Sequence, residues 1–93
     1  MKVLTIGSMN IDHVYSVDHI VQPGETLTTG GMNIFMGGKG INQSMAVAKA
    51  GAEVYHSGMI GDDGAMFLDA CKEYGVNSDF IRTIDVKTGH TII

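Results

Sequence analysis

Positions 37 to 40 of this 93-residue chain hold three glycines and one lysine, a composition suited to ligand binding. Glycine lets a ligand approach the backbone closely, and Lys39 adds a mobile, positively charged hydrogen-bond donor. A helix is expected to start directly after this loop, so N–H groups of its first turn that have no helical partner can serve the same ligand. The alternative interpretation is a tight strand-to-helix turn with a solvated lysine.

The loop matches neither of two common phosphate-binding motifs. A Walker A motif needs glycine at position 33 and serine or threonine at position 40, where the chain has Asn33 and Gly40. A dinucleotide-binding motif that starts at Gly38 needs glycine at position 43, where the chain has Gln43. The binding hypothesis therefore rests on the physical features of the loop and not on either motif.

Asn10 and Asp12 form a second group of candidate binding residues. They follow the first apolar run, Val3–Gly7, and lie two residues apart, so their side chains share one face of an extended segment. In open α/β sheets, ligands bind beyond the carboxyl ends of the strands. An amide and a carboxylate at that place can donate to and accept from vicinal hydroxyl groups. The alternative is a polar hairpin face without a ligand.

The segment after the glycine-rich loop is expected to be a helix of about three turns over residues 41–50. Gly51 is placed to end this helix as its C′ residue. Asn42 lies in the first turn, where asparagine is a mediocre helix former and its side chain can reach toward whatever the loop holds. The alternative role of Asn42 is simple N-terminal capping.

Alternating strands and helices predict an α/β fold with parallel strands and right-handed crossovers. Short apolar runs predict strands at 3–7, 53–61 and 80–83, with a further strand beginning at residue 90. A second helix is indicated by residues at helical spacing, which are Phe67, Ala70, Cys71 and Tyr74. Asp62 or Asp63 can cap this helix, and Gly75 ends it. Two extended segments, 11–18 and 27–36, joined through a turn at Pro23–Gly24, predict a long antiparallel hairpin.

Composition excludes several classes of protein. Hydrophobic residues are 44% and charged residues 17%, as in one globular domain. The net charge of −4 and the lack of a basic run argue against nucleic-acid binding. No apolar stretch is long enough for a signal peptide or a membrane span, so we expect a cytoplasmic protein. The single Cys71 allows no internal disulfide, and the four histidines lack metal-ligand spacing, so we expect no metal site.

The last four residues, His90–Ile93, are β-prone and have no turn or polar tail after them. Two or three parallel strands with their helices are also too few to cover both faces of a sheet. We therefore expect the chain to be the N-terminal part of a larger enzyme, or to be completed by another chain.

Several motifs together resemble the N-terminal signature of the pfkB family of carbohydrate kinases, in its ribokinase-like branch. The matching segments are Ser8–His13, Pro23–Thr26, Gly37–Ser44 with Gly51 beyond it, and Gly61–Asp63. These segments extend through the whole chain in the order that the family has. Several separated motifs that agree in this way are more specific than any single motif.

The resemblance implies a Rossmann-like three-layer α/β core with a small β-sheet lid over the sugar, of which residues 1–93 are only the N-terminal part. Lid strands are then expected at 11–21, at 27–36 and from 88 onward. Position by position, the residues implied to bind the sugar hydroxyls are Asn10, Asp12, Gly38, Lys39 and Asn42. The lids of two subunits are implied to clasp in a homodimer.

The resemblance also implies a kinase that uses ATP and Mg²⁺ to phosphorylate a pentose, with ribose or deoxyribose favoured over fructose or a nucleoside. The family's catalytic base is an aspartate near the far C-terminal part, beyond residue 93, and the ATP site lies there too. No catalytic residue and no metal ligand is therefore expected within this chain, and the 93 residues alone are predicted to be inactive. The alternative from another class is a non-catalytic α/β binding or dimerisation module.

Overall fold

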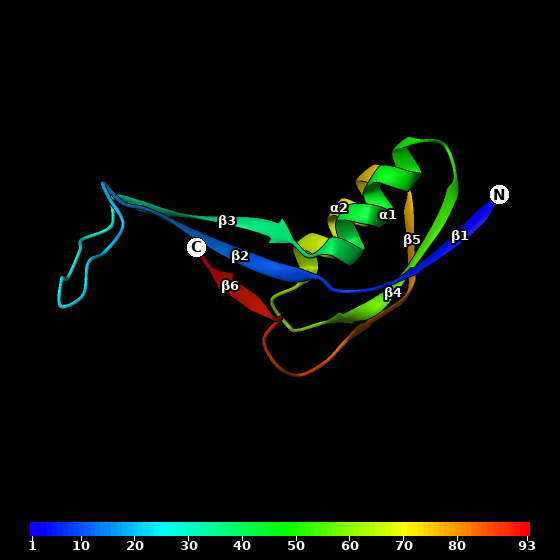
Figure 1. Cartoon of the computed structure of the whole chain (residues 1–93). Coiled ribbons are helices and arrows are strands. Elements are labelled where there is room, and N and C mark those ends of the chain that lie inside the picture. Colours follow the sequence, from blue (N-terminus) through cyan, green and yellow to red (C-terminus); the bar gives the residue numbers. More distant parts are fainter.

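A computed structural model describes residues 1–93 and shows two three-stranded sheets and two helices (Figure 1). In chain order the elements are β1 (Lys2–Ile6), β2 (Asn10–Ser16), β3 (Gly31–Gly37), α1 (Lys39–Lys49), β4 (Glu53–Ile60), α2 (Ala65–Tyr74), β5 (Val76–Thr83) and β6 (His90–Ile92). The α/β class expected from the sequence is confirmed.

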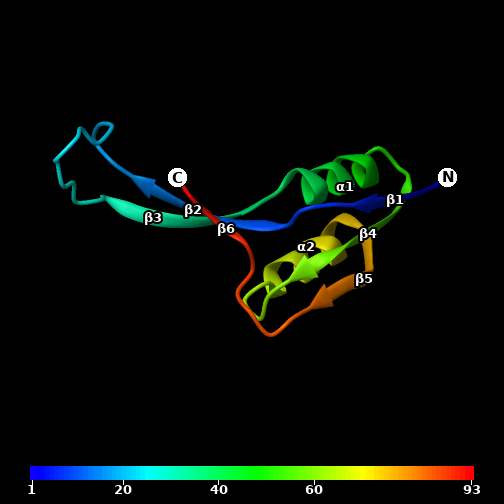
Figure 2. The ribbon, with the colours of Figure 1, turned by 60° about the horizontal axis from the view of Figure 1, so that its bottom comes forward.

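The larger sheet is parallel and has the strand order β1-β4-β5. Both helices lie on the same face of it, where they pack on the strands and on each other (Figures 1 and 2). The core between helices and sheet is apolar, and its fully or nearly fully buried members are Met9, Ile11, Ile41, Val54, Ile60, Phe67, Cys71 and Val76. Neither helix is long and apolar enough to cross a membrane.

The other face of this sheet is open. It presents large apolar side chains, and Leu4, Ile6, Met59 and Phe80 are each more than half exposed. An exposed apolar face of this kind needs a covering layer, because a parallel sheet is normally buried on both sides. The structure thus contains two of the three layers implied by the family resemblance.

The helix ends follow local sequence signals. Gly51 and Gly75 follow α1 and α2 with φ values of +101° and +77°, a conformation that glycine adopts without strain. On α2, Phe67 and Cys71 are buried as their spacing predicts. Tyr74 differs, since it is 38% exposed at the last turn of the helix.

The smaller sheet, named the lid sheet here, has the strand order β3-β2-β6. β2 pairs antiparallel with β3 and parallel with β6. In both views the sheet extends to one side of the helices and the parallel sheet (Figures 1 and 2). β2 ends at Ser16 and β3 begins at Gly31, so both strands are shorter than the expected ranges 11–21 and 27–36.

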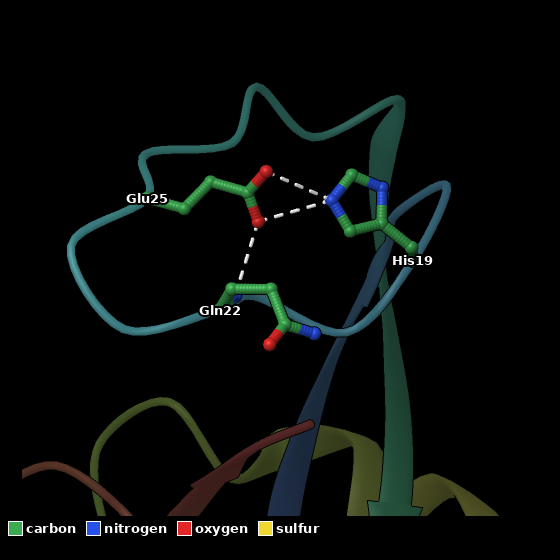
Figure 3. A network of polar contacts seen from close by, with 3 residues as sticks. All are labelled: His19, Gln22 and Glu25. Carbon is green, nitrogen blue, oxygen red and sulfur yellow. Dashed lines mark hydrogen bonds and ion pairs between the residues drawn. The ribbon is translucent and has the colours of Figure 1, made fainter.

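The tip of the lid sheet is held by polar contacts (Figure 3). The Glu25 N–H donates to the Gln22 carbonyl across the Pro23–Gly24 turn, and Gly24 has φ +80° as that turn requires. Both carboxylate oxygens of Glu25 lie 3.0 Å from His19 Nε2, and one also accepts the Gln22 N–H at 3.0 Å. These hydrogen bonds, the backbone one from Gln22 above all, lower the pKa of Glu25.

Two predictions about local structure were wrong. Neither Asp62 nor Asp63 caps α2, because the N-cap position is Gly64 and no side chain caps it. β5 starts at Val76 and not at residue 80, because pairing with β4 extends the strand through Asn77 despite its turn-like composition.

Candidate functional site

The candidate binding residues gather at the junction of the two sheets. Here β1 continues into β2, and β3 runs directly into α1 (Figure 1). The carboxyl end of β1, the start of β2 and the first turn of α1 therefore meet at one place. This is the edge of the parallel sheet at which α/β proteins bind their ligands.

Asp12 lies against the glycine-rich loop. A Cβ atom added to Gly37 would lie 2.5 Å from Asp12 Oδ2 and 2.7 Å from both Cγ and Oδ1. The carboxylate thus sits directly over the Gly37 backbone, in space that any side chain at that position would fill. Asn10 pairs with Gly37 in the β2–β3 register, and its side chain shares the Asp12 face of β2.

Gly38 joins the loop to the β1–β2 connection. It is the N-cap residue of α1 with φ +111° and ψ 130°, and an added Cβ would lie 2.5 Å from the Ser8 carbonyl oxygen. That same Ser8 oxygen accepts the Ile41 N–H at 3.2 Å. Only glycine combines this backbone conformation with so close an approach.

Lys39 and Asn42 lie in the first turn of α1, and both are exposed. Asn42 is therefore not the N-cap of the helix, which was the alternative role considered for it. The structure brings Asn10, Asp12 and Gly38 together at the junction and places the Lys39 and Asn42 side chains on the adjacent helical turn. This arrangement offers a carboxylate, two amides, an ammonium group and close backbone access, a set suited to a ligand rich in hydroxyl groups.

The junction does not fit a polyphosphate. The Asp12 carboxylate lies at the glycine-rich loop, and its negative charge would repel phosphate oxygens there. No three side chains of His, Cys, Asp or Glu come together in a way that could hold a metal ion. The residues at the junction thus do not fit an ATP-phosphate site.

A cavity of about 400 Å³ lies on the opposite face of β2, lined in part by His13, Tyr15, Asp63, Thr88 and His90. His13 follows Asp12 directly along the strand, so the two side chains point to opposite faces. None of the five candidate binding residues lines this cavity. It is a separate feature of the lid sheet.

Thr88 connects the lid sheet to the rest of the chain, a role that its sequence context did not predict. It is 3% exposed, its Oγ1 accepts the Gly61 N–H at 2.8 Å, and its own N–H donates to Asp63 Oδ1 at 2.7 Å. The hydrogen bond from the Thr88 backbone N–H, above all, lowers the pKa of Asp63. Asp63 therefore anchors the start of β6 and does not cap α2. The contact is non-local, so no sequence signal near Thr88 could have indicated it.

The comparison with family models decides the classification. The model described as "pfkB family carbohydrate kinase" matches residues 1–93, which is the whole chain. The chain belongs to the pfkB family of carbohydrate kinases. The family resemblance inferred from the sequence motifs is thereby confirmed.

Known proteins of the family are similar in sequence and in fold. The chain is 43% identical over 86 residues to the ribokinase of Haemophilus influenzae, an alignment that covers 89% of this chain and 28% of that protein. A ribokinase of Cryptococcus neoformans solved in complex with ADP superposes with TM-score 0.86 and 40% identity, over 98% of this chain and 29% of that one. A ribokinase of Arabidopsis thaliana solved with ribose and ATP superposes with TM-score 0.82 and 30% identity. That match covers 98% of this chain and 30% of the Arabidopsis one.

The chain spans less than a third of the length of each of these relatives. Its match lies within the ribokinase-like fold, which confirms the fold expected from the motifs. The open face of the parallel sheet is consistent with this short span, because the known relatives have about three times as much chain.

Proposed function

We propose that this chain is the sugar-binding N-terminal part of an ATP-dependent sugar kinase, which transfers the γ-phosphate of ATP to a hydroxyl group of a pentose. One observation carries the proposal: the carboxylate of Asp12 lies against the glycine-rich loop, on the same face of β2 as Asn10. Family membership supports kinase chemistry, and the relatives named ribokinase support the class of acceptor.

Each proposed binding residue has a role that its chemistry allows. The two oxygens of Asp12 accept hydrogen bonds from neighbouring sugar hydroxyls, and the Asn10 amide donates to or accepts from another. Gly38 brings the backbone close to the sugar ring because it carries no side chain. Lys39 and Asn42 donate from the first turn of α1. Charge-assisted bonds such as those to Asp12 are the stronger ones in such a set.

Ribose or deoxyribose is the acceptor that we favour. Relatives named ribokinase are 30% to 43% identical to the chain, and one named deoxyribokinase is 31% identical. The ribokinase of Arabidopsis thaliana was solved with ribose. Fructose and nucleosides remain the alternatives within the family.

Phosphoryl transfer itself needs further groups, which are a base for the attacking hydroxyl, donors for the transferred phosphate and usually Mg²⁺. The catalytic base and the sites for ATP and Mg²⁺ are proposed to lie in further sequence of the complete kinase. Two ribokinases were solved with ADP or with ribose and ATP, which supports ATP as the phosphate donor. The chain alone is accordingly proposed to be inactive.

A homodimer through the lid sheet is a further part of the proposal. The sheet carries exposed apolar side chains, and Ile34, Phe35, Ile92 and Ile93 are between 49% and 70% exposed. Apolar exposure on a three-stranded sheet of this size favours a protein partner.

The test uses the complete protein that contains this chain, with ATP, Mg²⁺ and a set of sugars and nucleosides. We expect ADP formation that depends on ribose or deoxyribose, and Asp12→Ala should lower kcat/KM for the sugar by about 10-fold or more. Asp69→Ala is the matched control, because Asp69 is an exposed carboxylate on α2 far along the chain from the junction. If no added sugar increases ADP formation by the wild-type protein, the result would contradict the proposal and favour a non-catalytic binding or dimerisation module.

A further inference from the structure

His56 is a buried polar residue that the proposed sugar chemistry does not use. It lies midway along β4, and its side chain has no exposed surface. The residues two before and four after it, Val54 and Ile60, are core residues beneath the helices. The imidazole therefore points from the sheet into the layer beneath the helices.

Both ring nitrogens of His56 have partners. Nδ1 lies 2.7 Å from Ser44 Oγ, a fully buried hydroxyl in the second turn of α1. Nε2 lies 3.2 Å from the Gly7 carbonyl oxygen. A carbonyl oxygen can only accept a hydrogen bond, so Nε2 carries the proton and donates it to Gly7. Burial lowers the pKa of His56 and so favours the neutral ring, in which Nδ1 has no proton and accepts from the Ser44 hydroxyl.

The two partners belong to the two halves of the candidate sugar site. Gly7 follows β1 directly and begins the connection to β2, which bears Asn10 and Asp12. Ser44 belongs to α1, and the glycine-rich loop leads into the first turn of that helix. His56 thus forms a hydrogen-bonded bridge between the two halves from a third element, β4.

These two halves also touch each other through their backbones. A Cβ added to Gly7 would lie 2.8 Å from Gly40 Cα, and one added to Gly40 would lie 2.5 Å from the Gly7 carbonyl carbon. Contacts between flat backbone segments have no interlocking side chains to fix their relative position. One directional bond, from the Ile41 N–H to the Ser8 carbonyl, crosses this contact. The bridge through His56 adds two more beside it, where small displacements would change the spacing of the binding residues.

We infer that His56 is a positioning residue for the sugar site, in which its bridge from Ser44 to the Gly7 carbonyl sets the spacing between the first turn of α1 and the β1–β2 connection. This inference rests on the proposed function. It assigns no contact with the sugar to His56, which lies beneath the site.

Three variants separate positioning from simple core packing. His56→Phe keeps the ring but removes both hydrogen bonds, and it leaves the Ser44 hydroxyl and the Gly7 carbonyl without partners. His56→Gln retains an amide oxygen that can accept from Ser44 and an amide nitrogen that can donate to Gly7. In the double variant Ser44→Ala/His56→Phe the hydroxyl is removed as well, so the part of the stability lost through the unpaired hydroxyl should return.

The kinetic experiment uses the complete kinase. We expect His56→Phe to raise KM for the sugar about tenfold, with kcat and KM for ATP changed by less than about twofold. His56→Gln should restore most of the sugar KM. The double variant should regain thermal stability while its sugar KM stays raised. A sugar KM that returns to the wild-type value together with stability would overturn the inference, since His56 would then act only through packing.

The bridge can be tested separately from the kinase activity. In the complete protein labelled with ¹⁵N-histidine, we expect long-range ¹H–¹⁵N correlations that show the proton of His56 on Nε2. A proton on Nδ1 would overturn the inference even in an active kinase. If instead the wild-type protein phosphorylates no sugar, the proposed function fails and the positioning role fails with it. If the wild-type enzyme phosphorylates the sugar and His56→Phe leaves the sugar KM unchanged, only the positioning role is contradicted.

Discussion

A single methyl group at Gly37 is expected to disable the sugar site without damaging the fold. In Gly37→Ala the new Cβ would lie 2.5 to 2.7 Å from three atoms of the Asp12 carboxyl group. Ordinary contacts of this kind begin at about 3.4 Å, so the carboxyl group must recede by about 0.9 Å or rotate away. Gly37 does not have a positive φ, so alanine itself adds no backbone strain.

The size of the effect follows from what Asp12 is proposed to do. A hydrogen bond to a charged group contributes about 1.5 to 3 kcal/mol. Loss of one such bond to a sugar hydroxyl lowers kcat/KM by about 10- to 100-fold. A displacement of about 1 Å within a binding site has a comparable effect. Stability should change little or rise slightly, because alanine is less flexible than glycine in the unfolded chain.

The assay is sugar-dependent ADP formation by the complete kinase, together with thermal unfolding. Gly31→Ala is the matched control, since Gly31 begins the same strand and no atom lies within 4 Å of its added Cβ. We expect the control to have the sugar kcat/KM of the wild-type enzyme. A Gly37→Ala enzyme with unchanged kcat/KM would refute the placement of Asp12 at the site.

Three further predictions concern the hydrogen-bonding residues Thr88, Asp63 and His56. Thr88→Val leaves the buried Gly61 N–H without its acceptor and should lower the free energy of unfolding by about 1 to 3 kcal/mol in chemical denaturation, whereas Thr88→Ser should not. The pKa of Asp63 is lowered from 3.8 in the folded chain, so its stabilising effect is present above that pH and is lost as pH falls through the lowered value. Asp63→Asn should remove this part of the acid sensitivity. Burial lowers the pKa of His56 from 6.5, so the unfolded chain binds the proton more readily than the folded chain. The free energy of unfolding should therefore fall as pH drops below 6.5. His56→Gln should lack this pH dependence.

The parts of the fold that depend on neighbouring residues were predictable from the sequence. Gly24, Gly51 and Gly75 have the positive φ values that their positions in a turn and at two helix ends require. The buried face of α2 followed from helical spacing. β5 was predicted too short, because its first residues have turn-like composition and only pairing with β4 holds them extended.

The candidate site shows the same division. The shared face of Asn10 and Asp12 follows from the two-residue period of a strand, which the sequence displays. The contact of Asp12 with Gly37 joins residues 25 positions apart in the chain and depends on the register of β2 against β3, which no local pattern specifies. The bridge through His56 likewise joins β4 to β1 across a sequence separation of 49 residues. Such contacts follow from the packing of whole elements and are visible only in the structure.

The most direct test of the account is a crystal structure of the complete protein with ribose bound. The account predicts that the sugar lies at the junction of the two sheets, with its hydroxyl groups within hydrogen-bond distance of the Asp12 carboxylate and the Asn10 amide, and with Lys39 and Asn42 facing it from α1. Ribose bound elsewhere, with Asp12 free of any contact to it, would contradict the account.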